Sequence, residues 1–396
     1  MNADARSLDP RSTIPEHSIE VIIPVHSATR PIARAASSAL RTTTGVRVTV
    51  VAHNIERQTI ERNLGALVDD PRLRVVELQD GIRSPAGPMN HGLDLATAEW
   101  FALLGSDDEL EDGALDAWFA LARSTSADVV IAGIQEVRRV ADPYPPKRSD
   151  RIQGLDGDLD RLAYRSAPLG LISLRAFPGL RFAPDLPSGE DLPMVTRLWF
   201  TGARVSFDPR LPLYIGHVDG DDRVTSEPRP VASDFAFLDH IESADWFQTM
   251  SPRSRRAFVL KTARIHVFDA IAARLTDVGL TEDDRSAIAG VVDRLRSISP
   301  SAFGLLSKAD SRALRVALAT GSSRATIADA VGARWNYGTS MTLITTNPLL
   351  VLHRHAPFRT LRAGIQVRQE VAEGYAARGG DQRYPGSPLT STTSTD

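Results

Sequence analysis

The first third of the chain alternates between short apolar runs and longer amphipathic stretches. Apolar runs rich in β-branched residues are typical of strands buried on both faces, and an apolar stripe with helical spacing is typical of surface helices. The pattern predicts strands at 19–25, 46–52, 73–78, 100–104 and 128–132, with helices at 29–43, 56–68, 88–98 and 113–124. Because parallel neighbours need crossover connections, this alternation predicts an α/β fold with a mostly parallel sheet flanked by helices.

After residue 132 the pattern changes twice. Prolines predict loops from 140 to 186, interrupted by a helix at 155–165 and an apolar stretch at 169–174. A helix follows Asp191, strand-like runs occupy 204–207 and 213–216, and 235–335 is helical in pattern. Prolines at 227–230 predict a boundary between domains. We therefore expect a flexible tail over 1–18, an α/β domain over 19–226, a mainly α-helical C-terminal domain over 231–370 and a disordered tail over 371–396.

The composition excludes several classes of protein. With no cysteine the chain forms no disulfide or thiolate metal site, which fits a reducing compartment, and its net charge of −3 argues against a nucleic-acid partner. We find neither a secretory signal nor an apolar run long enough to cross a bilayer, and therefore expect a cytoplasmic protein. The segment at 343–368 is basic and apolar, so peripheral contact with the inner face of the cell membrane remains an alternative. The helical region likewise leaves a homo-oligomer as an alternative.

Carboxylates gather in one loop of the predicted sheet. Ligands bind beyond the carboxyl ends of parallel strands, so the candidate loops are those that follow Val25, Ala52, Leu78 and Leu104. The last of these reads Gly105, Ser106, Asp107, Asp108 and Glu109. Mg²⁺ and Mn²⁺ take oxygen ligands and often bind one or two carboxylates together with substrate phosphates. The loop is a candidate metal site, with helix capping as the alternative interpretation.

A second acidic pair, Glu190 and Asp191, precedes an amphipathic helix. Ser188 and Asp191 have the spacing of a capping box, but Pro193 favours a later helix start that frees Asp191 to act as a general base. His217 follows an apolar run and precedes a polar cluster, so it is either structural or a ligand contact.

Together these segments resemble family 2 glycosyltransferases with the GT-A fold, over about residues 19–225. The resemblance rests on five signals in the family's order: 21–25, Asn90 with Gly92 and Ala96, 100–108, 189–191, and His217. Residues 171–191 particularly resemble bacterial enzymes that build cell-envelope or teichoic-acid-like polymers. The resemblance implies a metal-dependent, inverting hexosyltransferase that moves a sugar from a nucleotide-sugar donor, expected to be a UDP-sugar, to a glycan, polyol-phosphate or lipid-linked acceptor.

The resemblance also assigns roles to single residues. It places at the donor Pro24, Val25, His26, His53, Asn54, Asn90, Ser106 and Asp107. It assigns the contact to Mn²⁺ or Mg²⁺ to Asp107 and His217. It assigns the role of general base to Asp191 and a contact with the acceptor to Glu190.

The chain departs from the family at three places. Gly105 stands where the first signature aspartate is usual, Met89 replaces an arginine, and 52–54 lack the usual aspartate pair. These departures keep open a non-catalytic relative that binds a nucleotide sugar and acts as a scaffold. A dinucleotide-dependent oxidoreductase is disfavoured, because the turn at 26–30 contains no glycine.

Overall fold

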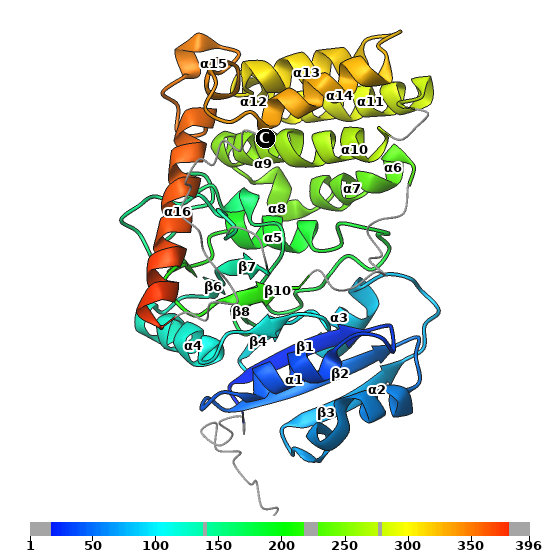
Figure 1. Ribbon diagram of the computed structural model, residues 1–396, viewed down its shortest axis with the longest axis vertical. Coiled ribbons are helices and arrows are strands. Elements are labelled where there is room, and N and C mark those ends of the chain that lie inside the picture. The colour runs from blue at the N-terminus through cyan, green and yellow to red at the C-terminus, as the bar shows by residue number, and fades with distance from the viewer. Residues whose placement is uncertain (1–16, 138–140, 218–228, 276–278, 380–396) are drawn as a thin grey trace, which may run out of the picture.

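A seven-stranded sheet forms one end of the protein in the computed structural model, which describes residues 17–137, 141–217, 229–275 and 279–379 (Figure 1). The strand order is β3-β2-β1-β4-β8-β6-β9. The first four strands in sequence are parallel to one another: β1 (Ile19–Val25), β2 (Val46–His53), β3 (Leu73–Leu78) and β4 (Trp100–Leu103). The other three are β6 (Val129–Ile131), β8 (Gly170–Ser173) and β9 (Val205–Ser206), of which β8 is antiparallel to its neighbours β4 and β6. The mostly parallel sheet predicted from the alternation is confirmed.

The helices between these strands lie close to their predicted positions. They are α1 (Ile32–Leu40), α2 (Arg57–Leu64) with the 3₁₀ turn η1 (Gly65–Asp69), α3 (Ala86–Leu95) and α4 (Ala114–Thr125). A close backbone approach occurs where α3 crosses the sheet: a Cβ atom at Gly92 would lie 2.5 Å from Ile22. Only glycine allows α3 to pack at this depth.

A three-stranded sheet lies beside the main one. It is formed by β5 (Glu109–Leu110), β10 (Tyr214–Gly216) and β7 (Ile134–Glu136). β10 is antiparallel to β5 and parallel to β7. This sheet joins the carboxylate loop to the residues around 217, which are more than 100 positions away in the sequence.

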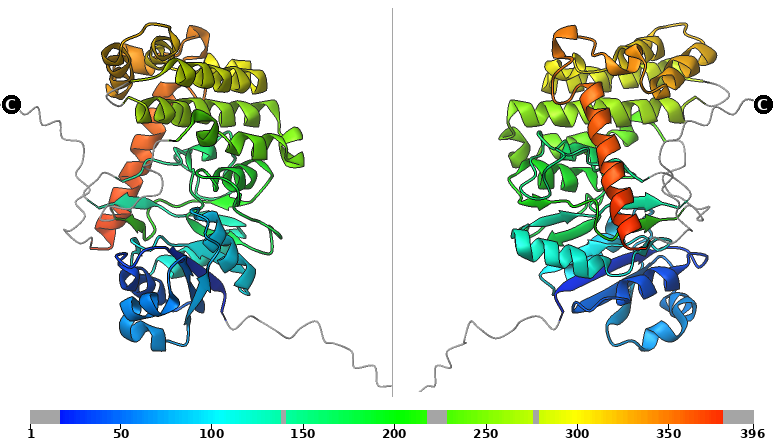
Figure 2. Two further views of the ribbon diagram at one scale, coloured as in Figure 1. Left: turned by 90° about the vertical axis from the view of Figure 1, so that its right-hand side faces the viewer. Right: turned by 60° about the vertical axis from the view of Figure 1, so that its left-hand side comes forward.

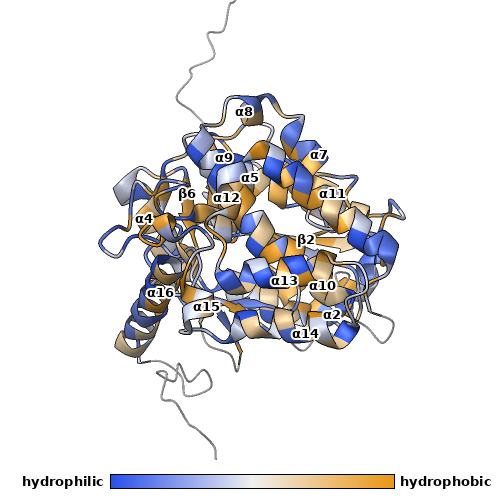
Figure 3. Ribbon diagram, turned by 90° about the horizontal axis from the view of Figure 1, so that it is seen from above, coloured by the Kyte–Doolittle hydropathy of each residue, from blue (hydrophilic) through white to orange (hydrophobic). Residues whose placement is uncertain are grey.

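The rest of the chain is helical, as predicted. α5 (Leu192–Phe200) covers the sheet, and the layers above it comprise α6 (Val231–Asp234), α7 (Phe237–Glu242), α8 (Asp245–Gln248), α9 (Pro252–Thr262), the π-helical turn η4 (Ala263–Val267), α10 (Phe268–Ala273), α11 (Glu282–Ile298), α12 (Pro300–Phe303), α13 (Lys308–Leu318), α14 (Arg324–Gly332), η5 (Ala333–Trp335), α15 (Ser340–Leu343) and η6 (Pro348–Leu350). Helices here carry hydrophilic and hydrophobic faces (Figure 3). One buried cluster runs from Ile22 and Phe101 in the sheet to Phe258 and Ile288 in the helices, so the two parts share a core.

The last helix, α16 (Pro357–Ala377), returns along the side of the molecule from the helical layers to the sheet (Figures 1 and 2). A Cβ atom at Gly374 would lie 2.3 Å from the carbonyl oxygen of Arg210, and Arg378 Nε donates to Glu111 at 2.9 Å. The disordered tail predicted from residue 371 is therefore wrong up to Ala377, because α16 packs on the α/β part; residues 380–396 lie outside the described residues.

Two other boundaries differ from the sequence expectation. The helix predicted at 155–165 is wrong: only the 3₁₀ turn η2 (Leu162–Tyr164) is present. The buried Asp160 carboxylate there accepts the backbone N–H of Asp156 and the guanidinium of Arg148, which replaces helical hydrogen bonds by side-chain contacts. The predicted tail at 1–18 ends earlier, since Ser18 N–H donates to Gly45 O at 2.8 Å; residues 1–16 are not described. Over the described ranges, no helix is both long and apolar enough to span a membrane.

Candidate active site

The carboxylate loop follows the end of β4, beside the last residues of β1. Leu104 is buried and its N–H donates to Ile22 O at 3.0 Å, which holds the start of the loop on β1. The Asp107 carboxylate forms an ion pair with Arg30, and Arg34 donates to the Asp107 carbonyl oxygen. Sequence reasoning assigned no role to Arg30, although it lies in a predicted ligand loop. Its guanidinium offsets the charge of the carboxylate that the resemblance assigns to the metal.

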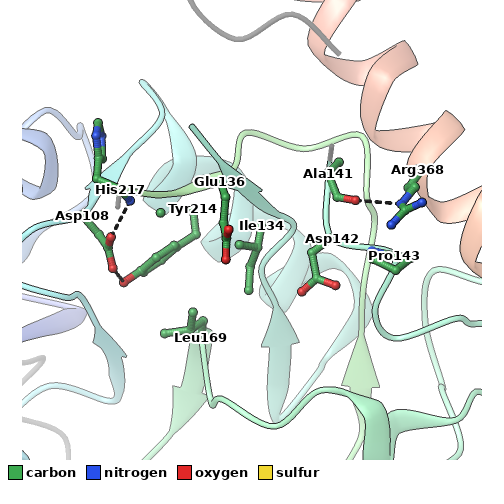
Figure 4. A pocket seen from close by; sticks show the side chains of 11 residues that line it. Asp108, Ile134, Glu136, Ala141, Asp142, Pro143, Leu169, Tyr214, His217 and Arg368 are labelled. Carbon is green, nitrogen blue, oxygen red and sulfur yellow. Dashed lines mark hydrogen bonds between the residues drawn. The ribbon is translucent and has the colours of Figure 1, made fainter. Parts of the chain in front are cut away.

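The neighbouring carboxylate, Asp108, turns toward the small sheet (Figure 4). It accepts the hydroxyl of Tyr214 and the backbone N–H of His217, the latter at 2.9 Å. Burial raises the pKa of Asp108, and these two hydrogen bonds oppose that rise. A Cβ atom at Gly105 would lie 2.4 Å from Asp108 Oδ2. The Asp108 carboxylate therefore occupies the space that a side chain at position 105 would need, which is a physical reason for the missing first aspartate.

His217 lies at the same edge as the carboxylate loop. Its Nε2 atom is 3.2 Å from Glu109 Oε1, so the imidazole contacts Glu109 and the backbone contacts Asp108. A pocket of about 630 Å³ opens beside it, with Glu136, Asp142 and, on α16, Arg368 among its lining residues. Figure 4 shows Asp108 and Glu136 on the side of the strands, Arg368 beside α16, and Asp142 between Glu136 and Arg368.

The described residues contain no group of three His, Asp or Glu side chains arranged to hold a metal ion. The carboxylate that the resemblance assigns to a donor-bound cation, Asp107, forms an ion pair with Arg30. Mg²⁺ commonly binds through one or two carboxylates, retains water and completes its coordination with substrate phosphates. The residues thus fit a site that the donor's diphosphate would complete, and they do not form a closed protein site.

The loops after β2 and β3 form the other side of the edge. His53 Nε2 lies 2.8 Å from Asp80 Oδ1, and the Asn54 amide donates to the same oxygen at 3.2 Å. Asn54 has a positive φ of 55°, a conformation that asparagine tolerates better than most residues. Burial would raise the pKa of Asp80, but hydrogen bonds from the Ile82 amide, His53 and Asn54 lower it. Asp80 was not predicted, although it follows Leu78 in one of the four candidate loops.

The end of β1 presents its predicted donor residues unequally. His26 is exposed and Pro24 is partly buried, whereas Val25 is 1% exposed and packs in the core. Ser106 is buried within the carboxylate loop. Val25 can therefore contact a ligand through its backbone but not through its side chain.

Asn90 holds a loop. Its amide nitrogen donates to Phe182 O and its amide oxygen accepts Phe182 N–H, each at 2.9 Å. Ser84 Oγ donates to Leu186 O at 3.1 Å a few residues further on. The Asn90 side chain, predicted to contact the donor, therefore ties α3 to the loop that leads to the acidic pair.

Asp191 is the N-cap residue of α5, yet its side chain makes no capping hydrogen bond. The capping box between Ser188 and Asp191 is therefore not formed, because the helix begins after Asp191. Burial raises its pKa to about 7, the charge of Glu190 adds to the rise, and Lys261 opposes it. Burial also raises the pKa of Glu190, opposed by Arg229. A carboxylate with a pKa near neutrality is suited to accept a proton at physiological pH.

Lys261, on α9, lies beneath this pair. It is 4% exposed, and its Nζ atom is 2.6 Å from His266 Nε2. Burial lowers the pKa of Lys261 to about 8, while Asp191 and Asp269 oppose that change. The structure thus brings His217 to the carboxylate loop and places Asp191 on a separate loop that α3 supports. Whether one substrate spans both groups stays a prediction.

Residues 20–175 match the family described as Glycosyl transferase family 2. The succinoglycan biosynthesis protein ExoO of Rhizobium meliloti (strain 1021) is 26% identical over 265 residues, which is 61% of this chain and 73% of ExoO. The structure of S. aureus TarS 1–349 in complex with UDP-GlcNAc is similar with a TM-score of 0.63 at 16% identity, over 81% of this chain and 92% of that one. The same TarS fragment in complex with UDP gives a TM-score of 0.55 at 18% identity over the same shares. Residues 20–175 therefore match glycosyltransferase family 2, and the fold is similar to that of TarS, with a mostly parallel α/β sheet followed by helices in the GT-A arrangement.

Proposed function

We propose that the protein transfers a sugar from a nucleotide-sugar donor to an acceptor hydroxyl with inversion, using Asp191 as the general base. The observation that carries the proposal is a carboxyl group at the start of α5 with a pKa of about 7 and no capping hydrogen bond. The acceptor oxygen bonds to the anomeric carbon as the bond from that carbon to the diphosphate oxygen breaks on the opposite face. The hydroxyl proton passes to Asp191, and the nucleoside diphosphate leaves.

The donor that we propose is a UDP-sugar. Two TarS structures of the same fold contain UDP-GlcNAc or UDP, and the edge of this sheet offers a carboxylate and two polar side chains for a base: Asp80, His53 and Asn54. A carboxylate oxygen can accept the imide N–H of uracil. The donor sugar would then point along the edge toward the carboxylate loop.

The cation that we propose, Mn²⁺ or Mg²⁺, would be held by Asp107 and the diphosphate. When bound, it would supply charge neutralisation for the leaving group. Asp107, the present ion-pair partner of Arg30, would then bind the cation. The Arg30 guanidinium would be released to pair with the diphosphate. Calorimetric titration with UDP should show Mn²⁺-dependent binding that Asp107→Ala abolishes. If Asp107→Ala binds UDP with the same metal dependence as the native protein, the assignment is wrong.

The acceptor that we propose is a glycan, polyol-phosphate or lipid-linked intermediate of envelope polysaccharide synthesis, supported by the likeness to a succinoglycan biosynthesis protein. Contact with the inner face of the membrane is supported by exposed apolar side chains in the basic segment at 343–368: Leu349, Leu352 and Phe358 are 89%, 75% and 46% exposed. Flotation with anionic vesicles should be lost in the double variant Leu349→Asp, Leu352→Asp. Flotation that survives this change contradicts the membrane contact.

The kinetic test compares the two acids of the pair. Asp191→Asn keeps the size of the side chain and removes its proton acceptor, so kcat should fall by ~10² to 10⁴ with little change in donor affinity. Glu190→Gln is the matched control and should raise the KM for acceptor more than it lowers kcat. Exchanged phenotypes would reverse the two roles, and full turnover by both variants would refute the mechanism.

A non-catalytic scaffold is the second candidate. Two observations favour it: a side chain at Gly105 would displace the Asp108 carboxylate, and the Asp107 carboxylate is already paired with Arg30. Such a protein would bind UDP-sugars, yet neither hydrolyse nor transfer them, and Asp191→Asn would leave every measured property of binding and turnover unchanged.

A further inference from the structure

We propose that a second cavity, enclosed by the Pro143–Tyr144 segment, α10, η5 and α16, binds a neutral sugar unit of the acceptor glycan. The inference rests on the proposed transferase function and names the class of acceptor. The cavity has a volume of about 230 Å³, and its lining includes Tyr144, Tyr164, Asp269, Trp335, Tyr337 and Arg368. Ligand sites of this type combine aromatic surface with a few fixed polar groups.

The aromatic surface is arranged in two pairs. Tyr144 and Tyr164 stack with ring centroids 5.5 Å apart and an interplanar angle of 20°. Trp335 and Tyr337 meet edge to face with centroids 5.9 Å apart, and they are 63% and 61% exposed. Large aromatic side chains that lie together and remain exposed indicate a binding surface more often than isolated ones do. The C–H face of a sugar ring is a suitable partner for such rings.

The polar groups of the cavity are held in place. Arg334 donates to Asp310 and to the carbonyl oxygen of Arg264, each at 2.8 Å. Arg264 in turn donates to the Tyr164 hydroxyl at 2.8 Å and to Leu305 O at 2.6 Å. These two guanidinium groups are committed to the protein, which disfavours a phosphate-bearing ligand and favours one that needs hydrogen bonds only.

Within the described part of the chain, two further groups in the lining make no hydrogen bond to the protein. Asp269, on α10, is an exposed residue that lines the cavity. Its carboxylate interacts with Arg334 and Lys261 only through their charges. The Thr360 hydroxyl on α16 is buried and has no hydrogen-bond partner among the described residues. A carboxylate can accept two adjacent sugar hydroxyls at once, and buried hydroxyl groups are normally satisfied.

The position of the cavity agrees with an acceptor site. Pro143 and Arg368 line both this cavity and the pocket beside Asp108 and His217. Arg368 is fixed by a hydrogen bond from its Nε atom to Ala141 O at 3.0 Å. An oligosaccharide could therefore extend along α16 from the active-site pocket into the helical layers, which would make acceptors of several sugar units bind better than single sugars.

The test measures binding of the labelled full-length protein to an array of neutral oligosaccharides of one to six units, with UDP binding as the second measurement. We expect native binding to rise with length, and to fall ~10-fold or more in Asp269→Asn and in the double variant Trp335→Ala, Tyr337→Ala. UDP binding should remain unchanged in both. Leu349→Ala, which alters an exposed side chain outside the cavity lining, is the matched control and should bind the glycan normally.

The nearly isosteric Asp269→Asn keeps the test decisive if the double aromatic variant unfolds. The proposal is overturned if the native protein binds no oligosaccharide on the array, or if Asp269→Asn binds as the native protein does. It is also overturned if the aromatic variant loses anionic vesicles but keeps the glycan, which would make the surface a membrane contact. Glycan binding measured in Asp191→Asn separates the two proposals: binding without catalysis supports the cavity even if the general base is another residue.

Discussion

Replacing Asp191 with asparagine should stabilise the fold at neutral and alkaline pH while it removes activity. Burial, reinforced by Glu190 and opposed by Lys261, raises the pKa of Asp191 from 3.8 to about 7. Because the folded pKa lies above the unfolded one, the proton is held more tightly in the folded state. The stability that protonation contributes is fully present below pH 3.8 and is lost as pH rises through about 7.

The shift of about 3 pKa units corresponds to roughly 4 kcal/mol at pH 8, at 1.36 kcal/mol for each unit. At pH 5 linkage leaves less than half of this cost in the native protein. Asparagine mimics the protonated form at every pH, and the pKa of about 7 already includes the attraction between Asp191 and Lys261. The advantage of the variant in free energy of unfolding should therefore shrink by roughly 2 to 3 kcal/mol from pH 8 to pH 5.

Urea unfolding followed by tryptophan fluorescence at pH 5, 6, 7 and 8 measures this slope, with thermal midpoints as a second observable. Asp116→Asn is a control of opposite sign. Burial would raise the pKa of Asp116, but hydrogen bonds from Thr44, Thr43 and Thr42 lower it to about 2, so this variant should be less stable than the native protein throughout the same range. A constant difference between Asp191→Asn and the native protein from pH 5 to 8 would refute the reasoning, because it would mean that Asp191 titrates normally.

Three further changes test separate parts of the structure. Lys261→Met removes the charge that lowers the pKa of Asp191, so the acidic limb of the pH profile of kcat/KM should move to higher pH; an unmoved limb would show that Asp191 does not govern it. Gly105→Asp restores the family's signature in sequence only, because its Cβ atom would lie 2.4 Å from a neighbouring carboxylate oxygen; we expect a loss of about 1–3 kcal/mol in unfolding experiments and no gain in Mn²⁺-dependent UDP binding. Gly374→Ala would place a Cβ atom 2.3 Å from Arg210 O, so α16 should loosen and limited proteolysis should cleave within it sooner, whereas an unchanged digestion pattern would show that this contact is dispensable.

Local patterns along the chain were sufficient to predict the α/β part. The strands β1 to β4 follow from mostly apolar runs, because strands in the interior of a parallel sheet are covered on both faces. The rule that ligands bind beyond the carboxyl ends of parallel strands selected the loops that contain Asp107 and Asp80. Pro193 correctly predicted a helix that begins after Asp191.

Contacts between residues far apart in sequence decided the rest. Arg30 pairs with Asp107, Asn90 ties its helix to Phe182, and Asp108 fills the space beside Gly105 because Tyr214 and His217 hold it there. Hydrophobic periodicity and turn composition report only on a few neighbouring positions, whereas these partners are 77, 92 and more than 100 residues apart. The sequence by itself therefore determined which segments form the sheet and which loops border the site. The tertiary structure alone decided which side chains in those loops are free to meet a substrate, because burial and charge pairing depend on neighbours that only folding brings together.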